Sequence, residues 1–236
     1  IIIIPTFFYI FSYLQFPDQI LSHMVLGSSL GVIVFSSLSS TFSHNFRGAV
    51  DWGLIKLVAP SIVVGSAIGG ITAGALDSDT LQGLVALFLV VASIQLIFEF
   101  PPPPQNPRTN LIGPVLAGGG IGWLSGVFGI GGGIFSVPYF YHRGLLMMKA
   151  IGTSAACGIP IAVAGSLSYM IIGYENINLP ENSIGYVYLP ATIIVGLVSS
   201  LTAKYGVKIA HRMKQKKLRI GFAFLVMLMA LNLLMR

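Results

Sequence analysis

The sequence predicts an all-α polytopic membrane protein. Only 8% of its 236 residues are charged and 55% are hydrophobic, whereas soluble domains carry about 25% charged residues. The apolar stretches are long and are separated by short polar turns, which favours a helical bundle over the ~10-residue alternating strands of an outer-membrane barrel. We therefore expect one polytopic domain surrounded by the lipid bilayer of the cytoplasmic (inner) membrane.

Hydropathy divides the chain into apolar segments that suit crossings of about 20 residues. They are residues 1–16, 23–42, 52–76, 81–98, 111–141, 148–172, 184–203 and 218–235. The sequence begins at Ile1, inside an apolar run with no visible signal peptide. We expect the natural N-terminus to lie upstream of this residue.

The segments resemble two copies of one pattern. In the same order, the first copy matches the second at residues 4–8 and 137–141, 25–29 and 150–154, 60–65 and 190–196, and 81–96 and 218–233. Between the copies, four consecutive prolines exclude a continuing helix and favour a stiff linker. The sequence predicts a first repeat over residues 1–100, a Pro-rich linker over 101–110 and a second repeat over 111–236. By this match, the N-terminal limb of the first repeat belongs upstream of Ile1.

Segment 111–141 is too long for one upright crossing and contains a glycine-rich break. Four of the five residues from Gly129 to Gly133 are glycine, and each glycine costs a helix interior about 1 kcal/mol relative to alanine. Broken backbone is tolerated at membrane depth only where protein or a water-filled cavity surrounds it. We expect two limbs that fold back as a hairpin at this break, which makes the break a candidate binding site.

The charge distribution predicts how the two repeats are related. A glycine-broken hairpin plus three transmembrane helices in each repeat inverts the second repeat relative to the first. This topology places Arg47 on the same side as residues 204–219, which hold seven of the thirteen Lys and Arg residues. The opposite side receives Asp18, Asp77, Asp79, Glu175 and Glu181. A single crossing over 111–141 would instead separate Arg47 from the basic cluster. The positive-inside rule therefore favours inverted repeats with basic loops in the cytoplasm, an architecture typical of secondary transporters.

The glycine run and the residues after it resemble the sulfite exporter TauE/SafE family of membrane transporters. The likeness is carried by Gly129-Ile130-Gly131-Gly132-Gly133, then Val137-Pro138, then Ala150-Ile151-Gly152-Thr153-Ser154, and it extends over nearly the whole chain through the repeat. The family has two related halves, each opening with a glycine-rich motif before a Val-Pro pair. The resemblance implies export of a sulfur-containing anion such as sulfite or an organosulfonate.

For a small anion the chain offers hydrogen-bond donors, because its predicted spans contain almost no Lys or Arg. A helix that begins after a glycine break presents unpaired N–H groups and the positive end of its dipole. Glycine also lets a ligand approach the backbone closely. The candidate substrate-binding residues are Gly129, Gly131, Gly132 and Gly133 in the break, and Gly27, Ser28, Ser29, Gly152, Thr153 and Ser154 on neighbouring helices.

Packing offers a second interpretation of each feature. Glycines such as Gly65 and Gly69 often allow close helix packing in membranes, and serine hydroxyls often bond their own helix. His23 could carry a proton near neutral pH, but a lone surface histidine is the simpler interpretation.

The leading functional hypothesis is a secondary transporter or facilitator that moves its anion by alternating access around a midplane site. An anion channel would share that site without a conformational cycle. An intramembrane serine hydrolase is less favoured, because its serine needs a base within reach and the four histidines lie near span ends.

The sequence assigns neither an enzyme activity nor a cofactor. It contains no ATP-binding Gly-Lys-Ser or Gly-Lys-Thr loop, and its single Cys157 excludes a multi-cysteine metal site. The net charge of +6 is explained by membrane topology, so we expect no nucleic-acid partner. The oligomeric state is left open.

Overall fold

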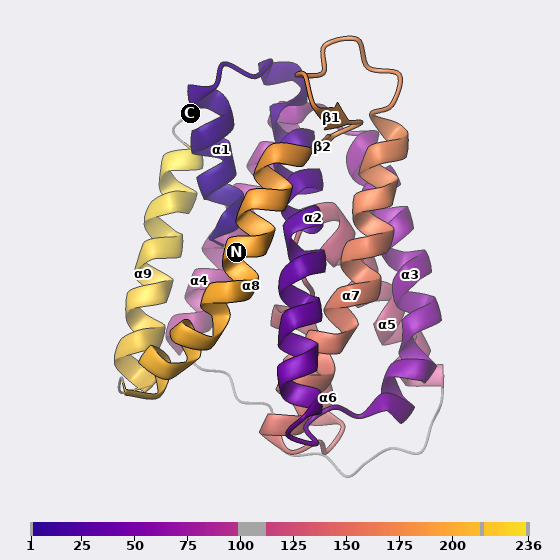
Figure 1. Cartoon of the computed structure of the whole chain (residues 1–236), viewed down its shortest axis with the longest axis vertical. Helices are drawn as coiled ribbons and strands as arrows, with labels where there is room; N and C mark the ends of the chain where they lie inside the picture. The colour runs from indigo at the N-terminus through magenta and orange to yellow at the C-terminus, as the bar shows by residue number, and fades with distance from the viewer. Residues whose placement is uncertain (1, 99–111, 213–214, 235–236) are drawn as a thin grey trace.

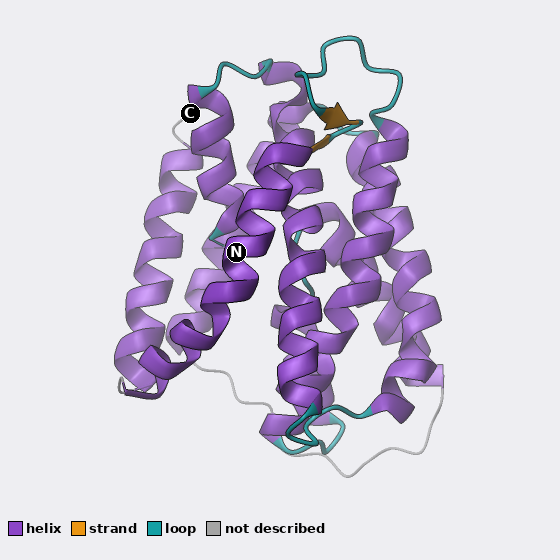
Figure 2. Cartoon of the chain, viewed as in Figure 1, coloured by secondary structure: helices purple, strands orange, loops and turns teal. Residues whose placement is uncertain are grey.

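The computed structural model describes residues 2–98, 112–212 and 215–234 as a bundle of helices with one small two-stranded ribbon (Figure 1, Figure 2). The helices are α1 (Ile3–Tyr13), α2 (Asp18–Asn45), α3 (Trp52–Gly74), α4 (Ser78–Phe98), α5 (Ile112–Phe128), α6 (Gly133–His142), α7 (Met147–Ile172), α8 (Leu189–Arg212) and α9 (Gln215–Leu234). Strands β1 (Ser183–Ile184) and β2 (Val187–Tyr188) pair antiparallel between α7 and α8. The predicted linker, residues 101–110, lies outside the described residues.

Within the described residues, four helices, α2, α3, α4 and α7, are long and apolar enough to cross a bilayer. Large hydrophobic side chains also face outward, including Val64, Leu116 and Ile194, where lipid can cover them. These observations confirm the predicted fold class, an all-α polytopic membrane protein.

The structure differs from the prediction just before α8. A helix was expected from residue 184, but residues 183–188 form the ribbon and α8 begins at Leu189. Asn182 and Gly185 have φ angles of 63° and 53°, a left-handed conformation that ends a right-handed helix. The ribbon therefore replaces the first turn of the expected helix.

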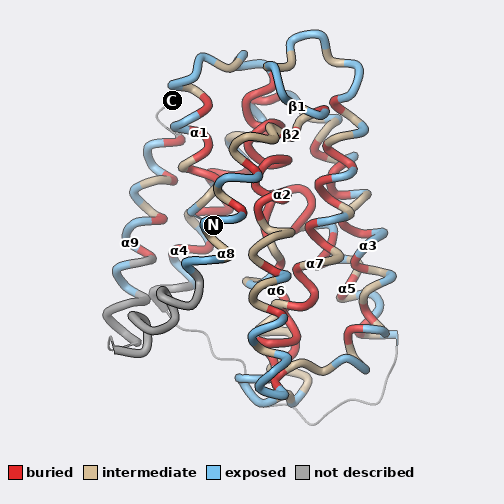
Figure 3. Tube along the Cα trace, viewed as in Figure 1, coloured by how far each residue is buried: buried red, intermediate tan, exposed pale blue. Residues whose placement is uncertain are grey.

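Segment 111–141 breaks where the glycines predict. In Figure 1 the outer ends of α5 and α6 both lie at the bottom of the bundle, and the tip between them lies inside it. Gly129, Ile130 and Gly132 are buried at this tip, within the interior that Figure 3 shows in red. The pair is thus a hairpin that enters the bundle and returns to the same end.

Helices that correspond in the two predicted repeats run in opposite directions. In Figure 1, α2 descends while α7 ascends, α3 ascends while α8 descends, and α4 descends while α9 ascends. α1 begins near mid-height and ascends, whereas α6 descends to the bottom. These directions are those that inverted repeats require, and the repeat itself stays a prediction.

Glycines allow α3 and α5 to pack against each other. A Cβ on Gly65 or Gly69 of α3 would overlap a backbone carbonyl oxygen of α5, and a Cβ on Gly122 or Gly126 of α5 would overlap one of α3. For Gly65 and Gly69 the structure therefore supports the packing interpretation.

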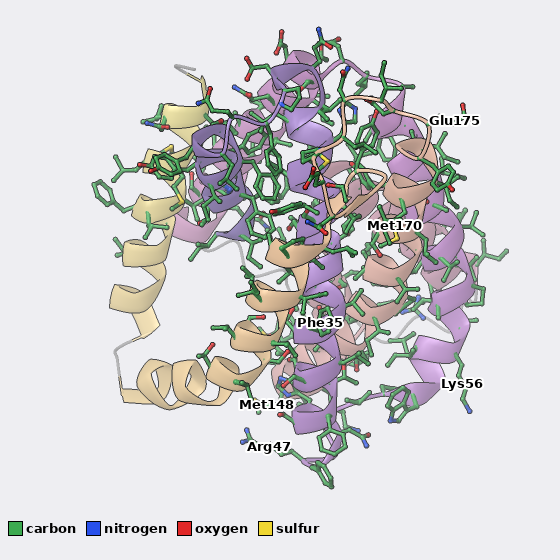
Figure 4. The ribbon with its side chains drawn as sticks, turned by 45° about the horizontal axis from the view of Figure 1, so that its top comes forward. Phe35, Arg47, Lys56, Met148, Met170 and Glu175 are labelled. Atoms are coloured by element: carbon green, nitrogen blue, oxygen red, sulfur yellow. The ribbon has the colours of Figure 1, made fainter. Side chains whose placement is uncertain are left out.

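The charged side chains separate toward the two ends of the bundle. We call the end where α2 leads into α3 and α6 into α7 the basic end, and the opposite end the acidic end. Figure 4 shows Arg47 and Lys56 at the basic end and Glu175 at the acidic end. Arg143, directly after α6, and Lys149, in the first turn of α7, also belong to the basic end, together with the α3 N-cap Asp51. The acidic end holds the start of α2 with Asp18, the α3–α4 turn with Asp77 and Asp79, and the loop after α7 with Glu175 and Glu181.

Candidate functional site

The glycine break has a defined backbone geometry. Gly129 and Gly132 have φ angles of 65° and 72°, which L side chains rarely adopt. Ile130 donates its amide hydrogen to the carbonyl oxygen of Ser125 over 3.1 Å, and the carbonyl oxygen of Gly132 accepts from Ser136 N over 2.8 Å. Gly132 is the N-cap of α6, and no side chain caps this helix start within the described chain. The amide of Phe135 also donates to Gly132 O, over 3.0 Å, so the amides available to a ligand are the first two of α6, those of Gly133 and Ile134.

Three serines lie at the break, Ser29 of α2, Ser136 of α6 and Ser154 of α7. Ser29 of α2 donates to the carbonyl oxygen of Gly129 over 2.9 Å. Ser136 donates to the carbonyl oxygen of Gly132 over 2.9 Å, and its Oγ lies 2.7 Å from Ser154 Oγ of α7. A hydroxyl has one proton to donate, so Ser154 donates to Ser136 in this arrangement. Of the three predicted serines, Ser29 and Ser154 thus belong to the surroundings of the break.

Sequence reasoning missed Ser125 and Ser136. Ser125 of α5 is fully buried, and its Oγ has no hydrogen-bond partner among the described residues. This Oγ would lie 3.2 Å from a Cβ placed on Gly132, so the hydroxyl sits directly beside the break. Each missed serine lies four residues from a left-handed glycine, Ser125 before Gly129 and Ser136 after Gly132. One helical turn of spacing is the sequence signal that could have found them.

The remaining residues of Gly27-Ser28-Ser29 and Gly152-Thr153-Ser154 have different partners. Gly27 packs on the carbonyl oxygen of Tyr186, and Ser28 Oγ accepts the amide hydrogen of Tyr188 over 2.9 Å. At the opposite end, Gly152 packs on the carbonyl oxygen of Ala49, and Thr153 Oγ1 accepts the amide hydrogen of Asp51 over 3.0 Å. We call these two arrangements the loop clamps. The structure therefore brings only the third residue of each motif, Ser29 or Ser154, to the glycine break.

Neutral groups surround the break. Apolar contacts come from Leu26 and Ile33 of α2, Ile121 of α5 and Ile161 of α7, and the polar contacts are the serine hydroxyls. Gly133 is exposed and Gly131 half-buried, so a small ligand could reach the backbone on that side. No cluster of His, Cys, Asp and Glu within the described ranges could hold a metal ion. Chemically, the arrangement offers amide and hydroxyl donors without a formal charge.

His23 is buried, although a surface position was the simpler prediction from the sequence. The simpler interpretation placed it at the surface, but only 4% of the residue is exposed. Its Nε2 lies 3.2 Å from the carbonyl oxygen of Ala73 and 3.1 Å from that of Leu76, and its ring packs on Tyr186. The end of α3 and the ribbon together cover the side chain, a tertiary arrangement that its sequence position does not reveal.

Comparison with known proteins gives consistent matches over the whole chain. A family model described as "Sulfite exporter TauE/SafE" matches residues 1–233. A probable membrane transporter protein of Haemophilus influenzae is 30% identical over 241 residues, covering 100% of this chain and 90% of the relative. The probable membrane transporter protein MJ0441 of Methanocaldococcus jannaschii is 28% identical over 242 residues, covering 99% of this chain and 86% of the relative. No solved structure matches significantly.

Proposed function

The chain belongs to the sulfite exporter TauE/SafE family and is a membrane transporter rather than an enzyme, and we propose that its cargo is a small sulfur-containing anion. Sulfite and organosulfonates are the cargo class that the family suggests. The observation that carries the proposal is the start of α6, which has no side-chain cap within the described chain and faces a break lined by hydroxyls. Unpaired amides and the positive end of a helix dipole favour an anion.

The neutral character of this site suits transport. A ligand must bind well enough to enter and weakly enough to leave. A buried Lys or Arg would hold an oxyanion through a strong charge-assisted hydrogen bond, whereas amides and hydroxyls hold it through neutral donors. In this proposal the first amides of α6 and the Ser125 hydroxyl bind the anion directly. The hydroxyls of Ser136 and Ser154 join them by giving up their present hydrogen bonds, and Gly131 and Gly132 allow the anion's close approach.

Alternating access is the proposed mode of transport. The loop clamps support it, because α2 holds the ribbon at the acidic end while α7 holds the α2–α3 loop at the basic end. Release of one clamp at a time would open the break to one side only. With the basic end cytoplasmic, export would start at the α2–α3 loop and finish at the ribbon.

A binding screen on the purified protein tests the cargo. Isothermal titration would compare sulfite, sulfate, thiosulfate, sulfoacetate, taurine and simple carboxylates. We expect measurable binding of sulfite or a sulfonate and at least tenfold weaker binding of carboxylates. Equal affinity for carboxylates, or no binding of any sulfur oxyanion, would refute the proposed cargo class.

Counterflow distinguishes a transporter from an anion channel. Proteoliposomes loaded with unlabelled cargo should accumulate labelled cargo transiently, with a rate that saturates. A Gly132→Val variant should abolish this uptake, whereas Gly120→Val, at a helix position with open space beside it, should retain it. A flux that neither saturates nor shows counterflow would favour the channel.

A further inference from the structure

His23 combines burial with an unused nitrogen. Nε2 faces two carbonyl oxygens, which only accept hydrogen bonds, so Nε2 carries the hydrogen of the neutral ring. Nδ1 is then a lone-pair acceptor, and it is buried without a hydrogen-bond partner among the described residues. A proton can therefore bind at Nδ1 without displacing an existing hydrogen bond.

The ring of His23 supports the ribbon that covers the acidic end. Its centroid lies 4.9 Å from that of Tyr186, with an angle of 32° between the ring planes. The amide of Tyr186 donates to the carbonyl oxygen of Tyr169 over 3.1 Å, and the amide of Tyr188 donates to Ser28 Oγ. His23 and the acidic-end loop clamp thus hold the same short segment.

The charged groups around His23 favour an added positive charge. The negative charge of Asp77, in the α3–α4 turn, favours a positive charge on the imidazole. Asp79 follows two residues later in the chain. The helix that carries His23, α2, also carries the charged residue Asp18, and the loop between α7 and the ribbon carries Glu175 and Glu181. The titratable group that packs on the imidazole ring is Tyr186. The carbonyl oxygens that Nε2 meets belong to the C-terminal end of α3, where the helix dipole favours a cation.

The closed ribbon, in contrast, disfavours the protonated ring. A hydrogen on Nδ1 would be buried with no acceptor among the described residues, and a buried donor without an acceptor is costly. Movement of Tyr186 away from the ring would let water reach Nδ1 and remove that cost. The carboxylate of Asp77 would still stabilise the charge.

We propose that His23 is a proton-binding site whose occupation opens the ribbon at the acidic end. The proton comes from the solution and binds Nδ1, while Nε2 keeps its hydrogen. The proposal goes beyond the proposed function, because it concerns a proton and one end of the protein rather than the cargo.

The basic end offers a comparison. When Gly27 is matched with Gly152, the position of His23 corresponds to Met148, which is 56% exposed and cannot bind a proton. Figure 4 shows Met148 at the basic end near Arg47. The position that matches His23 at the basic end therefore has no proton-binding group, although His44 lies elsewhere at that end, in the last turn of α2.

Thiol labelling tests the proposal on the full chain in detergent, without any cargo. Val187→Cys replaces a fully buried ribbon residue, and Ile177→Cys provides a reference at a position that is 95% exposed. Native Cys157 is fully buried. The ratio of maleimide labelling rates, Val187→Cys over Ile177→Cys, should rise severalfold as the pH falls from 8 to 5.5.

Substitution of the histidine gives the control. His23→Gln retains an N–H donor for the two carbonyl oxygens but has no titratable nitrogen, so the ratio should no longer depend on pH. His142→Gln, at the end of α6, should behave as the unmodified protein. A spin label at Ile184→Cys, an exposed ribbon position, is a second reporter, and its mobility should rise over the same pH range.

A labelling ratio that is constant with pH, or one that keeps its pH dependence in His23→Gln, would overturn the proposal. So would a pH-dependent change in the spin label that survives the same substitution. Because neither reporter needs an anion, the labelling and mobility measurements would still test the role of His23 if the binding screen found no cargo.

Discussion

Gly132 and Gly120 are both glycines of the hairpin, but their surroundings differ. Gly132 has a φ angle of 72°, and an added Cβ would press on Ile161, whereas Gly120 lies inside α5 with no atom within 4 Å of such a Cβ. Gly132→Ala should therefore lower the free energy of unfolding by about 1–2 kcal/mol through the left-handed backbone alone. Gly120→Ala should be neutral or stabilising, since alanine favours a helix interior. Thermal unfolding in detergent measures both, and equal effects would contradict the description of the break.

Ser125 and Ser29 separate binding from stability. Ser125→Ala removes a hydroxyl with no partner among the described residues, so the unfolding midpoint should stay unchanged while anion affinity falls severalfold. Ser29→Ala removes the hydrogen bond to Gly129, which should cost about 1 kcal/mol of stability. Titration with the preferred anion and thermal unfolding on the same samples provide the comparison. An unchanged affinity in Ser125→Ala would remove this hydroxyl from the proposed site.

The sequence predicted the residues of the break better than their partners. A dense glycine run identifies the break by itself, because close packing between helices does not require so many adjacent glycines. Ser28 and Ser29 are adjacent, however, and successive residues of a helix point about 100° apart. Only the fold shows that Ser29 faces the break while Ser28 faces the ribbon. The sequence could not separate these roles.

At the level of elements, the two loop clamps form a matched pair. Ser28→Ala and Thr153→Val each remove one hydrogen bond that holds a loop, so each should lower stability by about 1 kcal/mol. Because neither hydroxyl contacts the break, anion affinity should change less than in Ser125→Ala. Thermal unfolding and titration on both variants would check this. A large affinity loss without a stability loss would return these residues to the binding site.

Hydropathy located the helices, but it could not predict the ribbon. Long apolar runs are sufficient to place α2, α3 and α7, because a bilayer sets their length. The ribbon depends on left-handed backbone at Asn182 and Gly185 and on contacts with α2 and α7. The burial of His23 depends on the same contacts, which explains why its sequence position alone indicated a surface residue.

For the whole molecule, the distribution of charge predicts its orientation. With the basic end cytoplasmic, cysteines at Lys56 and Lys149 should react with a membrane-impermeant thiol reagent only in inside-out vesicles. A cysteine at Glu175 should react only in right-side-out vesicles, because it lies at the other end of the bundle. Labelling of Lys56→Cys and Lys149→Cys from opposite sides would contradict the inverted topology.

The neutral lining of the break has a consequence for how binding should respond to acid. Its contacting side chains are apolar or hydroxyl groups, and none of these gains or loses a proton in the physiological range. Affinity as a function of pH should therefore follow the ionisation of each anion and shift from one anion to the next. The ribbon, through His23, should respond to acid even when no anion is bound. The protein should then show two separate responses to acid: one in anion affinity, set by the ionisation of the anion, and one in ribbon opening, set by His23.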